Sequence, residues 1–215
     1  AAILIEGDRI VAVGPASEIE IPADAAVIDT RSRTMLPGLI DTHVHLIVLG
    51  HGSYGTWFPW IAAHGGERML ARVMEISARQ LLMAGVTSAV DLGAPLDPSL
   101  RVRARIDAGE IPGPRMMMSG PWIARGGRGG AMQLGFGGLS VQSSAEAARE
   151  VTRLARAGVD VIKAHARLTF ADYEAIVAAA HQHGLRVMAH VYAEEDVRHA
   201  LEAGVDVLQH VGSAG

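Results

Sequence analysis

From position 36 onward, short apolar runs alternate with longer stretches in which apolar residues recur every three or four positions. The short runs predict buried β-strands, whereas the three-to-four spacing predicts amphipathic helices. Ser143 and Thr169 stand at helix-capping positions, and Gly85, Gly158 and Gly204 follow helix ends, which supports this division. The predicted strands are 35–40, 86–92, 115–119, 159–164, 185–191 and 205–211, and the predicted helices are 67–84, 100–108, 144–157, 170–183 and 194–203.

The first 28 residues follow a different pattern. Short apolar runs at 3–5, 9–13 and 26–28 predict three strands, and Gly7-Asp8 predicts a hairpin turn between the first two. Three such strands bury little apolar surface by themselves, so we expect this unit to pack against something else. The strand–helix alternation that follows predicts an α/β fold with a parallel sheet.

A weak internal repeat precedes three of the predicted strands. The tripeptide Ala-Gly-Val occurs at 84–86, 157–159 and 203–205, and each copy is followed five or six residues after its glycine by a polar residue: Asp91, Lys163 and His210. His190 stands in the same relation to Gly184. Because α/β barrels place their active sites at the carboxyl ends of their strands, these polar residues are expected at such a face.

Composition narrows the classes of function. A net charge of −4 over 215 residues gives no basic footprint for nucleic acid, and no apolar run approaches the ~18 residues of a membrane span. The chain has no cysteine, so any metal must be held by histidine and carboxylate groups. The start of the chain lacks the basic segment of a signal peptide, which favours a cytoplasmic protein.

His43 and His45 form the first candidate site. They follow the apolar run 35–40, and side chains two residues apart in an extended backbone point to the same side. Both imidazoles can therefore reach one metal ion, and neutral imidazole suits zinc and similar divalent cations. A pair of exposed loop histidines without any ligand is the alternative interpretation.

Lys163, the only lysine in the chain, ends the apolar run 159–162. Burial lowers the pKa of a lysine and frees its amine to act as a nucleophile or to react with carbon dioxide. A snorkelling or ion-paired lysine is the alternative. His190 and His210 end two further predicted strands, and a closed barrel would bring them to the same spot as the first pair, which favours a metal site.

Two further features lie near this predicted face. Tyr192 follows His190 by two residues, so its phenol could hold a substrate carboxylate or carbonyl, with simple rim packing as an equal alternative. The glycine-rich stretch 126–138 lacks the Gly-Lys-Ser/Thr of a phosphate loop. It predicts a loop over the barrel mouth in which Arg125 or Arg128 contacts an anion.

Several of these motifs, taken together, resemble those of the metal-dependent amidohydrolase superfamily. They are the stretch Leu36-Pro37-Gly38-Leu39-Ile40-Asp41-Thr42-His43-Val44-His45, the Gly85-Val86-Thr87-Ser88 strand, the Lys163 strand and the two later histidines. The nearest likeness is to the carboxylated-lysine branch that includes prolidase-like Xaa-Pro dipeptidases. The resemblance implies a (β/α)8 TIM-type barrel, with residues 1–35 in a small β-sandwich domain and residues 36–215 in the N-terminal portion of the barrel. About six βα units are visible, so we expect a truncated barrel; a smaller open α/β fold is the alternative.

The resemblance also implies a site. His43 and His45 would bind one divalent ion, which in this family is usually zinc, and His190 and His210 would bind a second. Lys163 would bridge the two ions as a carbamate formed with carbon dioxide. The implied activity is hydrolysis of an amide or peptide C–N bond of a small molecule or dipeptide by a metal-activated water. The family's general base, an aspartate ending strand eight, would lie past Gly215, so no catalytic base is assigned.

Three questions stay open at the level of sequence. A cyclic-amide hydrolase or deaminase of the same superfamily, similar to imidazolonepropionase and often using one metal ion, fits the same motifs. A catalytically incomplete fragment that binds metal fits the missing strands. The sequence also leaves open whether copies of the chain associate into a homo-oligomer.

Overall fold

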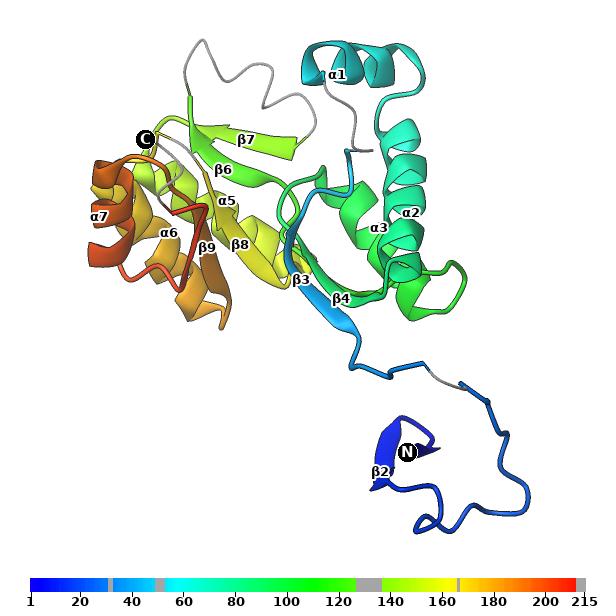
Figure 1. Cartoon of the computed structure of the whole chain (residues 1–215). Helices are drawn as coiled ribbons and strands as arrows, with labels where there is room; N and C mark the ends of the chain where they lie inside the picture. The colour runs from blue at the N-terminus through cyan, green and yellow to red at the C-terminus, as the bar shows by residue number, and fades with distance from the viewer. Residues whose placement is uncertain (31–32, 49–52, 127–136, 166, 212–215) are drawn as a thin grey trace. The chain divides into compact units, whose positions relative to one another are not determined.

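The computed structural model describes residues 1–215 apart from 31–32, 49–52, 127–136, 166 and 212–215 (Figure 1). The chain divides into two compact units, Ala1–Pro37 and Gly38–Gly215. All the predicted site residues belong to the second unit.

The first unit contains a hairpin. Strands β1 (Ala2–Glu6) and β2 (Arg9–Gly14) pair antiparallel, and Gly7 takes a φ of 60° in the turn, as predicted for a tight hairpin. The predicted third strand at 26–28 is wrong. These residues are irregular and largely exposed, because no strand among the described residues of this unit offers them backbone partners.

The second unit contains two parallel sheets, with strand orders β3-β4-β5 and β10-β9-β8-β6-β7. Between them, the amide of Asp160 donates a hydrogen bond of 2.9 Å to the carbonyl of Met118, so the last strand of the first sheet meets a strand of the second. This arrangement confirms the predicted α/β fold with parallel strands, as in part of a barrel. The strands are β3 (Leu39–Val44), β4 (Val86–Asp91), β5 (Arg115–Met118), β6 (Trp122–Arg125), β7 (Gly138–Val141), β8 (Val161–Ala164), β9 (Arg186–His190) and β10 (Val207–Gln209).

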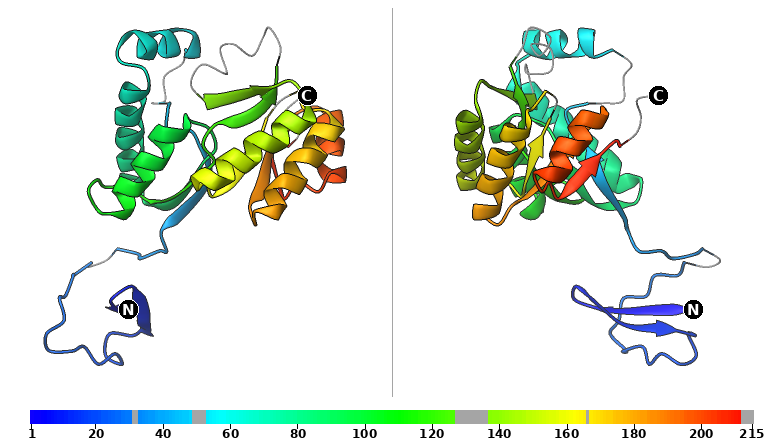
Figure 2. Two further views of the ribbon diagram at one scale, coloured as in Figure 1. Left: turned by 180° about the vertical axis from the view of Figure 1, so that it is seen from behind. Right: turned by 90° about the vertical axis from the view of Figure 1, so that its left-hand side faces the viewer.

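Helices follow most of the strands. Figure 2 shows α5 and α6 side by side along the outer face of the five-stranded sheet, where they bury apolar residues such as Leu154 and Ile176. A second apolar cluster lies under α2, around Leu70 and Met74. The helices are α1 (Tyr54–Ala63), α2 (Glu67–Met83), α3 (Leu96–Asp107), α5 (Ser144–Ala157), α6 (Phe170–Gln182) and α7 (Glu194–Glu202). All but α1 were predicted, although α3 begins four residues earlier than expected.

The strand that carries the first histidine pair differs from its prediction. The sequence predicts a buried strand at 35–40, but β3 begins at Leu39, and Leu39 and Ile40 are 57% and 71% exposed. The reason is topological: β3 is an edge strand of its sheet and pairs only with β4 among the described strands. Apolar side chains on that edge therefore have no neighbour to cover them within the part of the chain that the structure describes.

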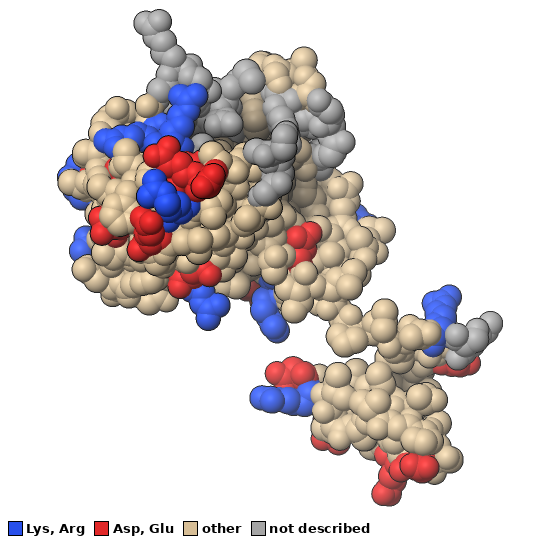
Figure 3. Space-filling model, turned by 60° about the vertical axis from the view of Figure 1, so that its left-hand side comes forward, with Lys and Arg blue, Asp and Glu red and all other residues tan. Residues whose placement is uncertain are grey.

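The surface of the described residues carries charges of both signs. Figure 3 shows acidic and basic side chains interleaved on one face of the second unit rather than a broad area of one sign. No helix among the described residues combines the length and the apolar character needed to cross a membrane.

A buried carboxylate connects α5, α6 and β6. Asp172 is fully buried and accepts hydrogen bonds from the Thr169 amide (2.9 Å), the Ser144 hydroxyl (2.7 Å) and the Arg125 guanidinium (2.9 Å). Desolvation raises the pKa of this carboxyl, but the hydrogen bonds and the arginine together hold the pKa below its usual value. The group is therefore an anion that stabilises the start of α6.

Asp172→Ala is expected to lower the free energy of unfolding by about 3 kcal/mol at pH 7, because it leaves buried donors without an acceptor. The carboxylate's contribution is present above the unfolded pKa of 3.8 and is lost as the pH falls through the lowered folded pKa. Denaturant unfolding at pH 7 and near pH 3 measures both effects. Glu150→Ala, which removes only the surface pair with Arg153, is the control and should cost less than about 1 kcal/mol. Equal losses in the two variants would contradict the assignment.

Candidate metal centre

Four strands bring the predicted site residues to one edge. His43 lies near the end of β3 and His45 directly after it, Lys163 lies in β8, His190 ends β9, and His210 follows β10. Parallel strands end at the same edge of a sheet, so these groups meet although up to 167 positions separate them in sequence.

Ring contacts connect the four histidines in one series. The ring centroids of His43 and His45 are 5.1 Å apart, those of His43 and His210 are 4.4 Å apart, and those of His190 and His210 are 5.0 Å apart. The two pairs predicted from sequence therefore form one cluster. The Nε2 atoms of His43 and His45 lie 3.3 Å apart.

Lys163 is close enough to this cluster for its charge to act on all four histidines. Its side chain is 1% exposed, and its Nζ has no hydrogen-bond partner among the described residues. Desolvation lowers the pKa of Lys163 from 10.5 to about 7, so a large share of the amine is neutral at physiological pH. In the described structure Lys163 is therefore neither a snorkelling lysine that reaches the surface nor an ion-paired one.

The histidines are poised in the neutral form. Desolvation is the largest cause that lowers the pKa of His43 and of His190 to about 4 and of His45 to about 3, and the charge of Lys163 adds to the effect in each. The pKa of His210 is lowered by the same two causes. Neutral imidazoles carry the lone pair that metal coordination requires, so no proton must be displaced at pH 7.

A glutamine sets the tautomer of the first histidine. The Nδ1 of His43 lies 2.9 Å from Oε1 of Gln209, and an amide oxygen can only accept, so Nδ1 carries the proton and donates it. The Nε2 of His43 then presents its lone pair toward His45. Such an outer hydrogen bond is a usual way of orienting a metal-binding imidazole.

The donor set fits a divalent cation. As they stand, no three histidine, aspartate or glutamate side chains among the described residues form a finished metal-binding group. The chemistry nevertheless matches, since a buried amine lies close enough to four neutral imidazoles to lower the pKa of each, and Nδ1 of His45 and Nζ of Lys163 are buried without hydrogen-bond partners in the described structure. Buried polar atoms without partners are costly, and a ligand that engages this cluster would relieve that cost.

The other predicted contacts differ in their surroundings. Tyr192 is 44% exposed, and its ring lies 4.4 Å from that of His190 and 5.6 Å from that of His210, so the phenol stands at the margin of the cluster. Arg125 is engaged by Asp172 and by the carbonyl of Gln142, which leaves its guanidinium committed to the fold. Arg128 lies outside the described residues.

Three residues of this neighbourhood are absent from the site predicted above. Gln209 has no signal beyond its place before His210, and Trp122 begins β6, a strand that was not predicted. His165 lies two residues past Lys163, and its only sequence signal is that position, yet its ring stacks on that of His190 at 4.2 Å.

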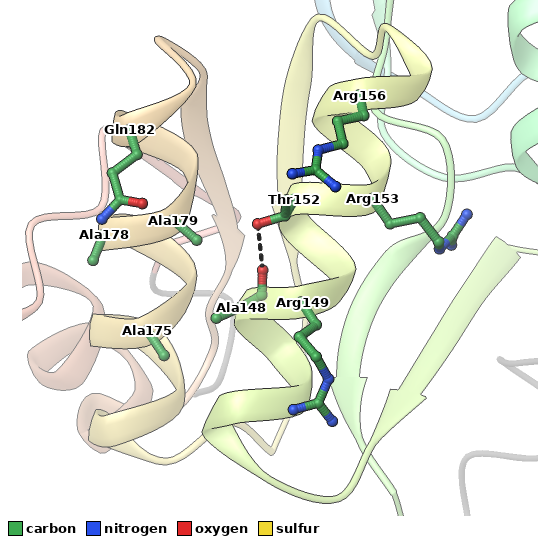
Figure 4. Close-up of a pocket in the computed structure, with 9 residues that line it drawn as sticks. All are labelled: Ala148, Arg149, Thr152, Arg153, Arg156, Ala175, Ala178, Ala179 and Gln182. Carbon is green, nitrogen blue, oxygen red and sulfur yellow. Dashed lines mark hydrogen bonds between the residues drawn. The ribbon is translucent and has the colours of Figure 1, made fainter.

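A separate groove lies on the outer surface between α5 and α6 (Figure 4). None of its lining residues belongs to the histidine cluster, and small side chains form its floor while arginines project from α5 along one side. It is lined by Ala148, Arg149, Thr152, Arg153, Arg156, Ala175, Ala178, Ala179 and Gln182.

Comparison with known families gives two matches along the chain. Residues 34–214 match the family model described as "Amidohydrolase family", which covers every residue of the histidine cluster. Residues 1–20 match a model described as "Imidazolonepropionase-like composite domain, bacteria".

Individual proteins show the same likeness. A solved structure from Bifidobacterium longum, named as a prolidase, is 32% identical with a TM-score of 0.78 and covers 97% of this chain and 48% of its own. Phenylurea hydrolase B is 26% identical with a TM-score of 0.78, covering 97% of this chain and 54% of its own. The imidazolonepropionase of Symbiobacterium thermophilum is 38% identical over 76 residues, which cover 30% of this chain and 18% of that protein. The chain thus spans about half the length of the solved structures that it matches.

Proposed function

The chain belongs to the amidohydrolase family, and from this premise we propose that it carries the metal centre of a hydrolase that cleaves an amide or peptide C–N bond of a small substrate. The observation that carries the proposal is the convergence of four neutral histidines around one buried lysine. Family membership and this cluster support the same reaction class.

The roles proposed for the residues follow their positions. His43 and His45 would hold one divalent ion, which we propose to be zinc, and His190 and His210 would hold a second. The neutral amine of Lys163 attacks carbon dioxide and loses one proton, which gives a carbamate on a long side chain. That carboxylate would bridge the two ions, and its formation needs the lowered lysine pKa.

Divalent ions at this site would lower the pKa of a water molecule and polarise the substrate carbonyl. The protein's own contribution is orientation. Gln209 holds the tautomer of His43, and the buried strand β8 keeps Lys163 away from bulk water. Tyr192, at the margin of the cluster, is proposed to bind the carboxylate or carbonyl of the substrate.

We propose a dipeptide or a similar small amide as the substrate. This rests on the likeness to the prolidase-named structure of Bifidobacterium longum, which extends over 97% of the chain, and on an exposed phenol beside the histidines. No role is proposed for nucleic acid or for a membrane, and a cytoplasmic location remains part of the proposal.

A second candidate is hydrolysis of a cyclic amide. The curated relatives are imidazolonepropionases, and residues 1–20 match a domain named after that enzyme. A single bound ion with an unmodified Lys163 would favour this candidate, whereas two ions with a carbamate favour the dipeptidase-like one.

Metal analysis of the purified protein tests the proposal. We expect about two zinc ions per chain, loss of hydrolysis after chelation and its return when zinc is restored, since catalysis requires the ions. Hydrolysis of a panel of Xaa-Pro dipeptides and of a cyclic amide then separates the two candidates. His43→Ala should lose both metal and activity, while His183→Ala, at an exposed histidine ending α6, should keep both.

Two outcomes would overturn the proposal. One is a folded protein that binds no divalent ion, and the other is activity that survives His43→Ala. Tight metal binding without hydrolysis of any substrate would instead support a catalytically incomplete metal-binding chain.

A further inference from the structure

Two aromatic residues that the proposed chemistry does not use lie beside the histidine cluster, and together they contact one histidine of each pair. Trp122 begins β6, and His165 follows β8, the strand that carries Lys163. The amide of His165 donates a hydrogen bond of 2.8 Å to the carbonyl of Ile123, and Ile123 pairs with Ala164. The pairing of β6 with β8 therefore sets the two rings side by side.

The rings form a continuous path across the site. The Trp122 and His165 rings stack at 5.1 Å with 27° between their planes, and His165 stacks on His190 at 4.2 Å and 15°. At the other end, the Trp122 ring meets the His45 ring edge to face at 5.8 Å. Both geometries are favourable for aromatic pairs. One path of ring contacts thus joins a histidine of the first pair to a histidine of the second.

The tryptophan is itself held in place by glycines. A Cβ atom on Gly93 would lie 2.0 Å from Cε3 of Trp122, one on Gly138 2.4 Å from its Nε1, and one on Gly137 2.6 Å from its ring. The ring is only 8% exposed, so it fills the space that these missing side chains leave. A ring confined in this way cannot slide along the site without a clash.

We propose that Trp122 and His165 act as an aromatic buttress, a pair of positioning residues that fixes the separation of the histidine pair at 43 and 45 from the pair at 190 and 210. The inference rests on the proposed function, because its purpose is to hold two metal-binding pairs at one spacing. In this proposal His165 acts only by stacking on His190, and its imidazole nitrogens do not contribute to positioning the metal ligands. Residues that orient metal ligands typically change metal affinity by about 10–100-fold when they are replaced.

The test compares variants that keep or remove the ring at position 165. His165→Phe keeps an aromatic face and removes both nitrogens, whereas His165→Leu fills a similar volume without a ring. His183→Ala is the control, since His183 is exposed and distant in sequence from both strands. Equilibrium dialysis with zinc alone gives affinity and stoichiometry, and the visible spectrum of the cobalt-loaded protein reports ligand geometry.

We expect His165→Leu to weaken zinc binding by about 10–100-fold and to shift the cobalt spectrum. His165→Phe and His183→Ala should stay within about threefold of the unmodified protein. A folded His165→Leu protein with unchanged affinity and spectrum overturns the buttress, and so does a His165→Phe protein that loses as much affinity as the leucine variant, because the nitrogen would then be essential. If His165→Leu does not fold, His165→Met makes the same comparison.

The test also separates this inference from the proposed function. If the unmodified protein binds no zinc, the proposed function fails. If it binds zinc and all the variants bind it equally well, only the buttress fails.

Discussion

Lys163→Met is expected to lower hydrolytic activity by about 10³-fold and to remove at least one of the two bound ions. The substitution keeps an unbranched apolar side chain of nearly the same length but removes the amine that we propose to carry the bridging carbamate. Without that carboxylate, the two histidine pairs would lose their shared ligand, and the loss should appear in turnover and in metal content together. Metal analysis and steady-state kinetics on the same preparation measure both.

The same substitution should stabilise the metal-free protein. The folded pKa of Lys163 is about 7 and its ordinary value is 10.5, so between these pH values the unfolded chain binds a proton that the folded chain does not. The stability of the unmodified protein therefore rises across this range. The advantage of Lys163→Met, about 5 kcal/mol at pH 7, should shrink toward zero near pH 10.5.

This prediction has two controls: a substitution in the neighbouring strand β9, and a labelling experiment that is specific because the chain has a single lysine. Met188→Leu replaces the residue of β9 that pairs with Lys163, and this volume-conserving change should cost less than about 1.5 kcal/mol at every pH. Because Lys163 is the only lysine, ¹³C-labelled bicarbonate should give one side-chain carbamate signal, and Lys163→Met should lack it. A variant with full metal content and activity would contradict the proposed bridge.

The residues of the proposed metal site were predictable because each follows a short apolar run. In a parallel sheet the ends of such runs meet, so His190 and His210 could be assigned to the same place as His43 and His45 without knowing any distance. Lys163 stood out because charge rarely ends a buried strand without a purpose.

Burial at the start of the barrel could not be predicted in the same way. Leu39 and Ile40 have the composition of a central strand, yet both are exposed in the described structure, where β3 pairs only with β4. Whether a strand is central or at an edge depends on which distant segments pair with it. Local hydrophobicity carries no information on that choice.

The aromatic path through Trp122 and His165 shows a second limit. The two residues are 43 positions apart and meet only because β6 pairs with β8. The run at 122–125 is only four residues long and sits beside a glycine-rich segment, so its pattern is that of a loop. Contacts made by such short strands follow from tertiary pairing, which periodicity does not reveal.

Asp91→Asn is expected to stabilise the metal-free protein by about 4 kcal/mol at pH 7 and above, and by almost nothing near pH 4. Asp91 ends β4 and is 1% exposed. Its Oδ1 accepts a hydrogen bond from the Leu46 amide at 3.4 Å, whereas Oδ2 has no partner among the described residues. Desolvation outweighs the backbone hydrogen bonds and raises the pKa of this carboxyl from 3.8 to about 7.

The sign follows from proton binding. Between pH 3.8 and about 7 the folded carboxyl holds a proton that the unfolded one has lost, so the stability of the unmodified protein falls as the pH rises. Asparagine keeps an acceptor for Leu46 and cannot ionise, so the variant should lack this fall. Asp206→Asn is the matched control and should lower the stability of the protein instead of raising it. Hydrogen bonds from His181 and Val187 hold the Asp206 pKa low despite desolvation, so this carboxylate stabilises the folded chain. Denaturant unfolding between pH 4 and 8 measures both, and parallel profiles for Asp91→Asn and the unmodified protein would show that the buried carboxyl does not titrate in this range.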